Sequence, residues 1–195
     1  MILMQTQDLI ATGGTRECYR HPGDPSKVIK ISRKKPFFKR KDPNWQEWRH
    51  YQYLMEKFGP LDFIGSYYGF VETCRGRGLM SDYIYDHDGQ RSRTLEKVLL
   101  HGNLYDLAAV RRALNIFCRR IIEKNIQLFD LNLTNILIKI NSDGSYRPVA
   151  ADIKGRYANL EFIPVSTYIP SFSRRKITRR CRRLLARVGQ EPVAL

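Results

Sequence analysis

Residues 129–138 read F-D-L-N-L-T-N-I-L-I, and this stretch constrains the fold of the chain more than any other. It follows an amphipathic helical pattern and runs into an apolar, β-branched segment that predicts a strand. Asp130 and Asn135 lie five residues apart between the two, and the intervening leucines can anchor the turn by becoming buried. The sequence therefore predicts a loop that holds a carboxylate and a carboxamide between a helix and a strand.

The pattern D-L-x-x-x-N followed by a strand resembles the catalytic loop of protein kinases. In such a loop the Asp orients the attacking hydroxyl group, and the Asn oxygen holds a metal ion on the nucleotide phosphates. The turn at 141–145 predicts a hairpin of residues 136–140 with 146–151, and Asp152 follows it directly. An acidic residue at this place is what a kinase needs to bind magnesium.

The composition sets the limits of these expectations. A chain of 195 residues with eleven Tyr and nine Phe has enough material for one domain with a real core. The four Cys and four His are scattered, which predicts neither a Cys/His metal site such as a zinc site nor a disulfide framework. Neither a signal-peptide pattern nor an apolar run of ~20 residues is present, and we expect a cytoplasmic protein. The formal charge of +15 points to an anionic partner.

The first third of the chain predicts three antiparallel strands over 8–11, 17–20 and 27–31. Gly13 and Gly14 stand at the first turn, where they form either an ordinary hairpin or a backbone cover for phosphates. The third strand reads V-I-K-I, and its Lys30 matches the kinase lysine that pairs with nucleotide phosphates. The alternative for Lys30 is a solvated residue on an edge strand.

A helix is predicted over 45–58, with Asn44 as its cap. In a kinase the helix after the lysine strand carries a glutamate that fixes the lysine, and by position we prefer Glu47 over Glu56. The alternative for Glu47 is a surface residue stabilised by the helix dipole.

Two further strands are predicted over 63–73 and 78–85, and the backbone near Ile84 and Tyr85 is expected to contact an adenine edge. Helices are then predicted over 94–100, with Thr94 as a cap, and over 103–124. A basic amphipathic helix over 173–187 carries an apolar stripe, consisting of Ile177, Cys181, Leu184, Leu185 and Val188.

Taken in order, these features resemble the PhoP regulatory network protein YrbL family, a small bacterial group similar to protein kinases. The resemblance also rests on G-G-T-R-E-C-Y-R-H-P, on D-H-D-G at 86–89, on N-I-L, on the shifted D-I-K-G and on the short basic C-terminus. It implies an α+β, protein-kinase-like two-lobed fold, with a five-stranded antiparallel N-lobe and a reduced, mainly helical C-lobe. The expected parts are an N-lobe over 1–86, a C-lobe over 87–172 and a basic helix and tail over 173–195.

The function that the resemblance implies is transfer of a phosphoryl group from ATP, with Mg²⁺, to a hydroxyl group of a small molecule or a protein. A link to a PhoP-dependent stress or envelope response is expected. The residues expected to take part are Lys30, Glu47 and Asp130 in catalysis, Gly13, Gly14, Lys30, Ile84 and Tyr85 in nucleotide binding, and Asn135 and Asp152 in metal binding.

Several positions depart from the kinase pattern. Leu128 and Phe129 stand where kinases often have H-R, Asn132 replaces the usual catalytic-loop lysine, and D-x-x-G replaces D-F-G. An inactive pseudokinase that binds a nucleotide or a partner is therefore the alternative.

The basic C-terminal helix is expected either to pack on its stripe or to contact an anionic membrane surface or a polyanion. In the membrane case the protein would lie peripherally at the inner membrane surface. Nucleic acid is the least favoured partner, because no nucleic-acid-binding motif is present.

Overall fold

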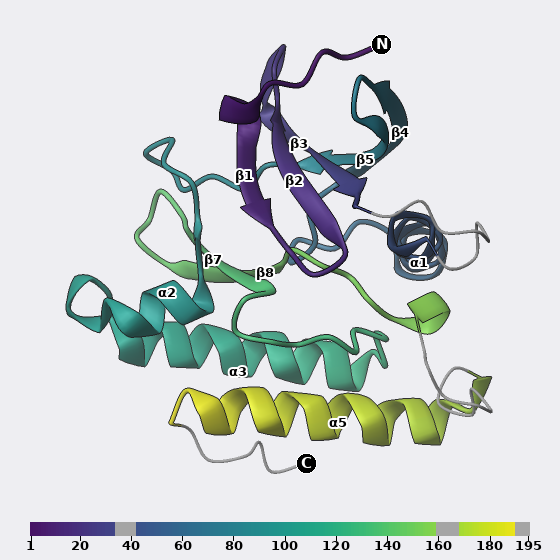
Figure 1. Cartoon of the computed structure of the whole chain (residues 1–195). Helices are drawn as coiled ribbons and strands as arrows, with labels where there is room; N and C mark the ends of the chain where they lie inside the picture. The colour runs from purple at the N-terminus through teal and green to yellow at the C-terminus, as the bar shows by residue number, and fades with distance from the viewer. Residues whose placement is uncertain (34–41, 159–167, 190–195) are drawn as a thin grey trace. The chain divides into compact units, whose positions relative to one another are not determined.

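The computed structural model describes residues 1–33, 42–158 and 168–189. The chain divides into two units, one of Met1–Gly59 with Gly65–Ile84 and one of Pro60–Ile64 with Tyr85–Leu195. Each unit has its own antiparallel sheet and its own helices (Figure 1). The fold class is α+β, and the predicted five-stranded antiparallel sheet is confirmed.

The sheet of the first unit has the strand order β1-β2-β3-β5-β4 (Figure 1). Its strands are β1 (Leu9–Thr12), β2 (Arg16–His21), β3 (Asp24–Ser32), β4 (Tyr67–Thr73) and β5 (Gly76–Asp82). Strand β3 therefore lies in the middle of the sheet, hydrogen-bonded to β2 and β5. The alternative that Lys30 is a solvated edge residue is wrong.

Both faces of β3 are covered, so Val28, Ile29, Lys30 and Ile31 are all buried. Ile29 and Ile31 are buried in a cluster with Met4 and Tyr19 on one face. Helix α1 (Pro43–Phe58) packs against the sheet and contacts β3, β4 and β5. A side chain at Gly78, opposite Ile31, would collide with Ile29, so glycine lets β5 approach β3 closely.

The predicted start of α1 is corrected by two residues. Asp42, rather than Asn44, caps the helix, because its carboxylate accepts a hydrogen bond from the Asn44 backbone N–H at 3.0 Å. Asn44 is fully buried, and its Nδ2 donates to the Lys30 carbonyl at 2.8 Å. The helix ends at Phe58, and the next residue is Gly59, whose φ of 71° suits glycine.

The described residues of the second unit form a three-stranded sheet, two long helices and a shorter one. The strands, in the order β6-β7-β8, are β6 (Arg93–Thr94), β7 (Ile136–Ile140) and β8 (Tyr146–Ala150). The predicted hairpin of β7 with β8 is confirmed. The helices are α2 (Leu95–Leu100), α3 (Leu107–Glu123) and α5 (Pro170–Arg187), and α3 and α5 lie side by side (Figure 1). Short 3-10 turns occur at Thr6–Asp8, Gly102–Leu104 and Arg156–Ala158.

The apolar stripe predicted on the C-terminal helix is buried in full, and helix α5 contacts α3. The α3 side chains that are buried include Leu114, Phe117, Cys118 and Ile121. Thr94 caps α2 as predicted, because its hydroxyl accepts a hydrogen bond from the Lys97 backbone N–H.

Several other predicted boundaries differ from the structure, among them the strand predicted over 78–85, which is Gly76–Asp82, and three of these differences have a local reason. The strand predicted from residue 63 begins at Tyr67, because Phe63 belongs to the second unit and packs edge-on against Phe117 at 5.5 Å between ring centroids. The helix predicted from residue 103 begins at Leu107, because the carboxylate of Asp106 caps it. Helix α5 begins at Pro170 rather than at residue 173, since proline is favoured in a first helical turn.

Candidate functional site

The first unit holds Lys30 and Glu47 in a buried ion pair. Lys30 Nζ lies 2.7 Å from Glu47 Oε1, and the side chains are 11% and 1% exposed. Strand β3 supplies the lysine, and the first turns of α1 supply the glutamate. The structure thus brings together these two predicted residues, whereas Glu56 is exposed on the same helix. We call this cluster the Lys30–Glu47 site.

Two further side chains converge on Glu47. Arg16 of β2 forms a second ion pair with it, and the Tyr67 hydroxyl of β4 donates a hydrogen bond to it. Burial opposes ionisation of Glu47, but the charges of Arg16 and Lys30 outweigh burial and hold its pKa well below the ordinary value. Glu47 is therefore an anion at neutral pH, and it fixes the lysine of the central strand.

Gly13 and Gly14 form the exposed turn between β1 and β2. The Gly13 backbone N–H donates to the Arg16 carbonyl at 2.8 Å, which closes the turn. Neither glycine has a positive φ, and a Cβ at Gly14 would meet no atom of the described structure within 4 Å. The fold of the described residues therefore does not itself require glycine at position 14.

The second unit brings together the three predicted residues of the loop before β7 and of the segment after β8. These are Asp130, Asn135 and Asp152. The Asn135 amide Nδ2 donates to the Asp130 carbonyl at 3.4 Å, and the Asn135 carbonyl accepts from the Ala151 backbone N–H at 2.9 Å. These bonds tie the loop to the segment that carries Asp152. The Asp130 and Asp152 side chains are 23% and 18% exposed.

A lysine connects the two carboxylates. Lys154 Nζ lies 2.9 Å from Asp130 Oδ2 and 3.1 Å from Asp152 Oδ2. Burial disfavours the charged lysine, but the Asp152 charge and the hydrogen bond to Asp130 outweigh burial and raise the pKa of Lys154. Asn132 Nδ2 also donates to Asp130. We call this cluster the Asp130–Asp152 site.

The donor atoms of this cluster suit a hard divalent cation. Asp152 offers carboxylate oxygens, and Asn135 offers its amide oxygen because its Nδ2 is already bonded to the backbone. Mg²⁺ usually takes one or two protein ligands of this kind, together with waters and phosphate oxygens. Within 1–33, 42–158 and 168–189, no three His, Cys, Asp or Glu side chains are grouped to hold a metal ion by themselves.

The sequence is also similar to a known family and to two curated proteins. The family described as PhoP regulatory network protein YrbL matches residues 2–189. The chain belongs to the YrbL family. The uncharacterized protein YrbL of Escherichia coli (strain K12) is 31% identical over 191 residues, covering 95% of this chain and 87% of its own length. The protein of the same name from Shigella flexneri matches with the same identity and coverage.

In this member of the YrbL family, Ile84 and Tyr85 lie where the two units divide. Ile84 is the last residue of the first unit, and Tyr85 is the first of the longer segment of the second. Tyr85 pairs with Arg91 in an isolated β-bridge. Their predicted contact with an adenine edge stays a prediction.

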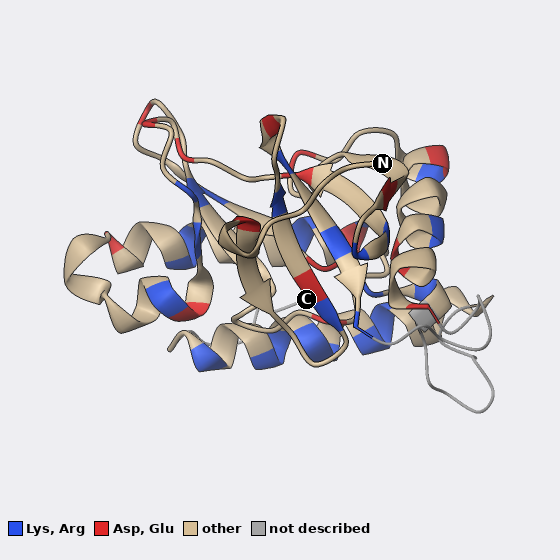
Figure 2. Ribbon diagram, turned by 45° about the horizontal axis from the view of Figure 1, so that its top comes forward, with Lys and Arg blue, Asp and Glu red and all other residues tan. Residues whose placement is uncertain are grey.

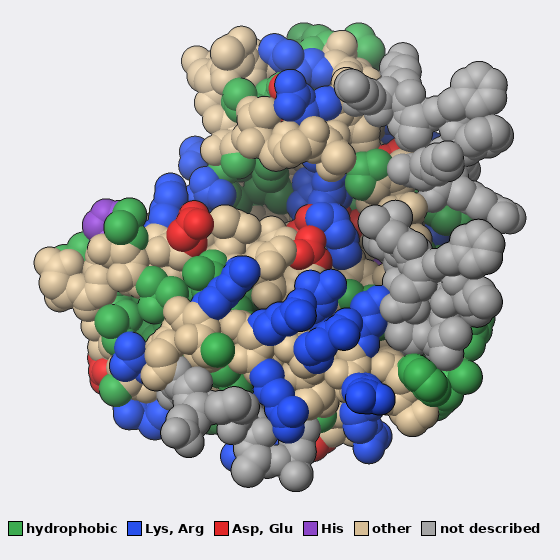
Figure 3. Space-filling model, turned by 60° about the horizontal axis from the view of Figure 1, so that its bottom comes forward, with side chains coloured by type: hydrophobic (Ala, Val, Ile, Leu, Met, Phe, Trp, Pro, Cys, Tyr) green, Lys and Arg blue, Asp and Glu red, His purple; other side chains and the backbone are tan. Residues whose placement is uncertain are grey.

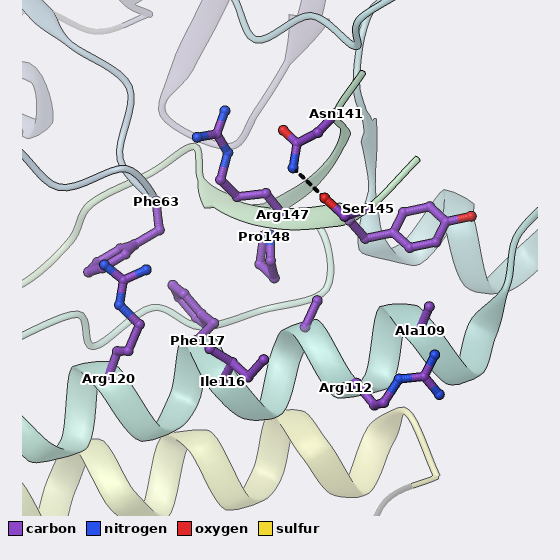
Figure 4. Close-up of a pocket in the computed structure, with 12 residues that line it drawn as sticks. Phe63, Ala109, Arg112, Ile116, Phe117, Arg120, Asn141, Ser145, Arg147 and Pro148 are labelled. Atoms are coloured by element: carbon purple, nitrogen blue, oxygen red, sulfur yellow. Dashed lines mark hydrogen bonds between the residues drawn. The ribbon is translucent and has the colours of Figure 1, made fainter. Parts of the chain in front are cut away.

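The second unit of this YrbL-family chain also contains a pocket of about 430 Å³ that the sequence did not indicate. Figure 4 shows it between α3 and the β7–β8 hairpin, with the rings of Phe63 and Phe117 at one end and Arg112 towards the other. Arg120, which also lines it, is paired with Asp62 at 2.8 Å. None of the predicted site residues lines this pocket.

The outer face of α5 is strongly basic. The helix carries no acidic residue, and Arg and Lys recur along it (Figure 2). The exposed members include Arg175, Arg179, Arg182 and Arg183, and basic side chains gather on this face of the unit (Figure 3). Among the described residues, no helix combines the length and the apolar character needed to cross a membrane. The anionic membrane or polyanion partner of the helix stays a prediction.

Sequence reasoning missed Arg16, Tyr67 and Lys154 as members of the two clusters. Only Lys154 had a usable signal, because it follows Asp152 by two residues within D-I-K-G. Arg16 and Tyr67 lie 31 and 20 residues from Glu47 in the chain. Nothing in the local sequence pattern indicates that they meet it.

Proposed function

We propose that this protein is a phosphotransferase with a protein-kinase-like fold that uses ATP and Mg²⁺. The observation that carries the proposal is the buried ion pair of Lys30 with Glu47, on the central strand and on the helix that follows it. A buried lysine whose charge is held by a glutamate is preorganised to bind nucleotide phosphates. In this proposal residues 1–86 form the N-lobe and residues 87–172 the reduced C-lobe.

The Asp130–Asp152 site supplies the other residues that the reaction needs. Asp152 and Asn135 would hold Mg²⁺, which neutralises charge on the phosphates when it is bound. Asp130 would orient the acceptor hydroxyl group and take up its proton. Gly13 and Gly14 would let the backbone approach the phosphates, and the backbone of Ile84 and Tyr85 would bind the adenine.

The acceptor is a hydroxyl group of a small molecule or a protein. The family description names the PhoP regulatory network, and we place the reaction in a response controlled by that network.

The second candidate function is a regulatory module without catalysis. Lys154 forms ion pairs with both carboxylates of the site, Asp130 and Asp152, and Asn132 stands in place of the usual catalytic-loop lysine. Both observations fit a pseudokinase that binds a nucleotide or a partner. Such a module would bind ATP without turning it over.

The test is transfer or release of the terminal phosphate from γ-labelled ATP by the purified protein with Mg²⁺. Asp130→Ala and Asp152→Ala should each abolish turnover, whereas Asp143→Ala, in the exposed β7–β8 turn, should leave it unchanged. Turnover that persists in both site variants would refute the assigned roles.

Thermal unfolding with MgATP, read together with the turnover assay, separates the two candidate functions. Nucleotide at a hundred times its dissociation constant should stabilise the protein by about 2.7 kcal/mol. Stabilisation without turnover would select the regulatory module, and the absence of both would reject nucleotide binding altogether.

A further inference from the structure

Lys154 lies outside the helices and strands, but its backbone is held in place by its neighbours. Ile153, directly before it, is fully buried, and the Phe129 backbone N–H donates to the Lys154 carbonyl at 2.8 Å. The backbone that carries Lys154 is therefore anchored on the loop that carries Asp130. Its side chain remains 42% exposed, so water reaches the ammonium group.

The environment of Asp130 contains one neutral donor and one cation. Asn132, from the same loop, donates an amide N–H to Asp130 Oδ1, and Lys154 donates to Oδ2 at 2.9 Å. A loop lysine at position 132 would provide a positive charge beside Asp130, and Asn132 does not. Lys154 provides that charge from a different segment of the chain.

The geometry points to Lys154 as the residue that neutralises the transferring phosphoryl group, in place of the lysine that Asn132 replaces. This inference rests on the proposed phosphotransferase function. In the ATP complex, the ammonium would keep its bond to Asp130 and exchange its bond to Asp152 for one to a γ-phosphate oxygen. Asp152 would then be released to ligate the metal.

In the proposed transfer step, Lys154 stays positively charged and neither gives up nor takes up a proton. The acceptor oxygen forms a bond to the γ-phosphorus, the bond from that phosphorus to the β–γ bridging oxygen breaks, and ADP leaves with the electron pair. The acceptor proton passes to Asp130. Because negative charge on the phosphoryl oxygens must be stabilised during transfer, a cation at this place lowers the barrier.

The same geometry has an opposite interpretation, which the test must exclude. A lysine between two carboxylates occupies the place of a cation, so it can instead block the metal. In that case, removing Lys154 would strengthen metal binding and raise turnover.

The experiment compares the full-length wild type with Lys154→Met, Lys154→Arg and the double variant Asn132→Lys/Lys154→Met. Position 132 already contacts Asp130, so a lysine there can replace the lost charge. Lys124→Met, which changes an exposed lysine at the end of α3, is the matched control. Turnover is measured with γ-labelled ATP, and the affinities for MgATP and MgADP are measured by calorimetry.

We expect Lys154→Met to lower kcat on the order of 100-fold and to weaken MgATP binding more than MgADP binding. Lys154→Arg should keep part of the activity, and Asn132→Lys should restore at least a tenth of it in the double variant. An activity of Lys154→Met equal to or above that of the Lys124→Met control would overturn the inference. So would a double variant that binds both nucleotides but is no more active than Lys154→Met.

Failure of this inference is distinguishable from failure of the proposed function. A wild type that binds neither nucleotide overturns both. If the wild type binds MgATP without turnover, the affinities for MgATP and MgADP decide whether the inference holds. A contact of Lys154 with the γ-phosphate predicts that Lys154→Met loses the preference for ATP over ADP, and an unchanged preference would overturn the inference.

Discussion

The Lys30–Glu47 site and the Asp130–Asp152 site both pair lysine with carboxylates, but they differ in how much water reaches them. Glu47 is 1% exposed and has two cations and a tyrosine hydroxyl as partners. In the other site one cation, Lys154, is shared by two carboxylates that are 23% and 18% exposed.

This difference indicates a difference in rigidity. A buried carboxylate that loses a partner cannot recover the interaction from water, so its partners are held in place. A half-exposed ammonium can exchange one oxygen for another at low cost, because water and the screening of charge compensate. The buried site therefore suits a fixed anchor, and the exposed one suits ligand exchange.

The largest expected effect comes from removing the centre of the buried site. Glu47→Ala removes the buried anion that pairs with both Lys30 and Arg16, and it should lower the free energy of unfolding by about 3–5 kcal/mol. Denaturant unfolding measures this value. Glu56→Ala, on the exposed face of the same helix, is the control and should change stability by less than about 0.5 kcal/mol. Equal effects of the two variants would mean that the Glu47 cluster does not stabilise the unit.

The next prediction compares how much Lys30 and Lys154 each contribute to the free energy of unfolding. Lys30→Met removes a buried charged partner of Glu47 but leaves Arg16 and Tyr67, and it should cost about 1.5–3 kcal/mol. Lys154→Met removes a half-exposed lysine and should cost less than about 1 kcal/mol. Unfolding in denaturant without nucleotide measures both. A Lys154 variant that is as unstable as the Lys30 variant would remove the contrast between the sites.

The last expected effect is a pH dependence of stability that belongs to Glu47. Because its pKa is lowered in the folded protein, the folded state binds its proton less readily than the unfolded chain. The stabilisation is thus complete above the ordinary value of 4.5 and is lost as the pH falls below it. The slope from this group is at most about 1.4 kcal/mol per pH unit.

Glu47→Gln should lose that part of the slope, whereas Glu56→Gln should keep it. Denaturant unfolding at a series of pH values between neutrality and acid provides the comparison. A Glu47→Gln variant with an unchanged slope would contradict the lowered pKa.

Strands and helices were predictable where a regular pattern of burial runs along one element. The alternation in V-I-K-I and the stripe from Ile177 to Val188 indicated the elements that the structure contains. Element ends were less predictable, because side chains such as Asp42 and Asp106 set them through single hydrogen bonds to the backbone. Residues 60–64 belong to the second unit although the segments before and after them belong to the first. No local sequence pattern indicated this, because it depends on the packing of Phe63 against Phe117.

Of the candidate site, the sequence supplied Lys30, Asp130, Asn135 and Asp152 through their order and spacing. It offered both Glu47 and Glu56 as the partner of Lys30. These two lie nine residues apart, which places them on opposite faces of a helix with 3.6 residues per turn. Only the packing of α1 on the sheet shows which face is inside, and that face carries Glu47.

The sequence by itself determined the α+β class, the order of the elements and membership of the YrbL family, because periodicity and similarity are properties of the linear chain. The tertiary structure decided the surroundings of each charge. Arg16 and Tyr67 reach Glu47 only because β2 and β4 are brought to the same helix, and Lys154 joins Asp130 to Asp152 only because its segment is bonded to the loop. Since the strength of a charge depends on its partners and on its exposure to water, the chemistry of these residues follows from the fold.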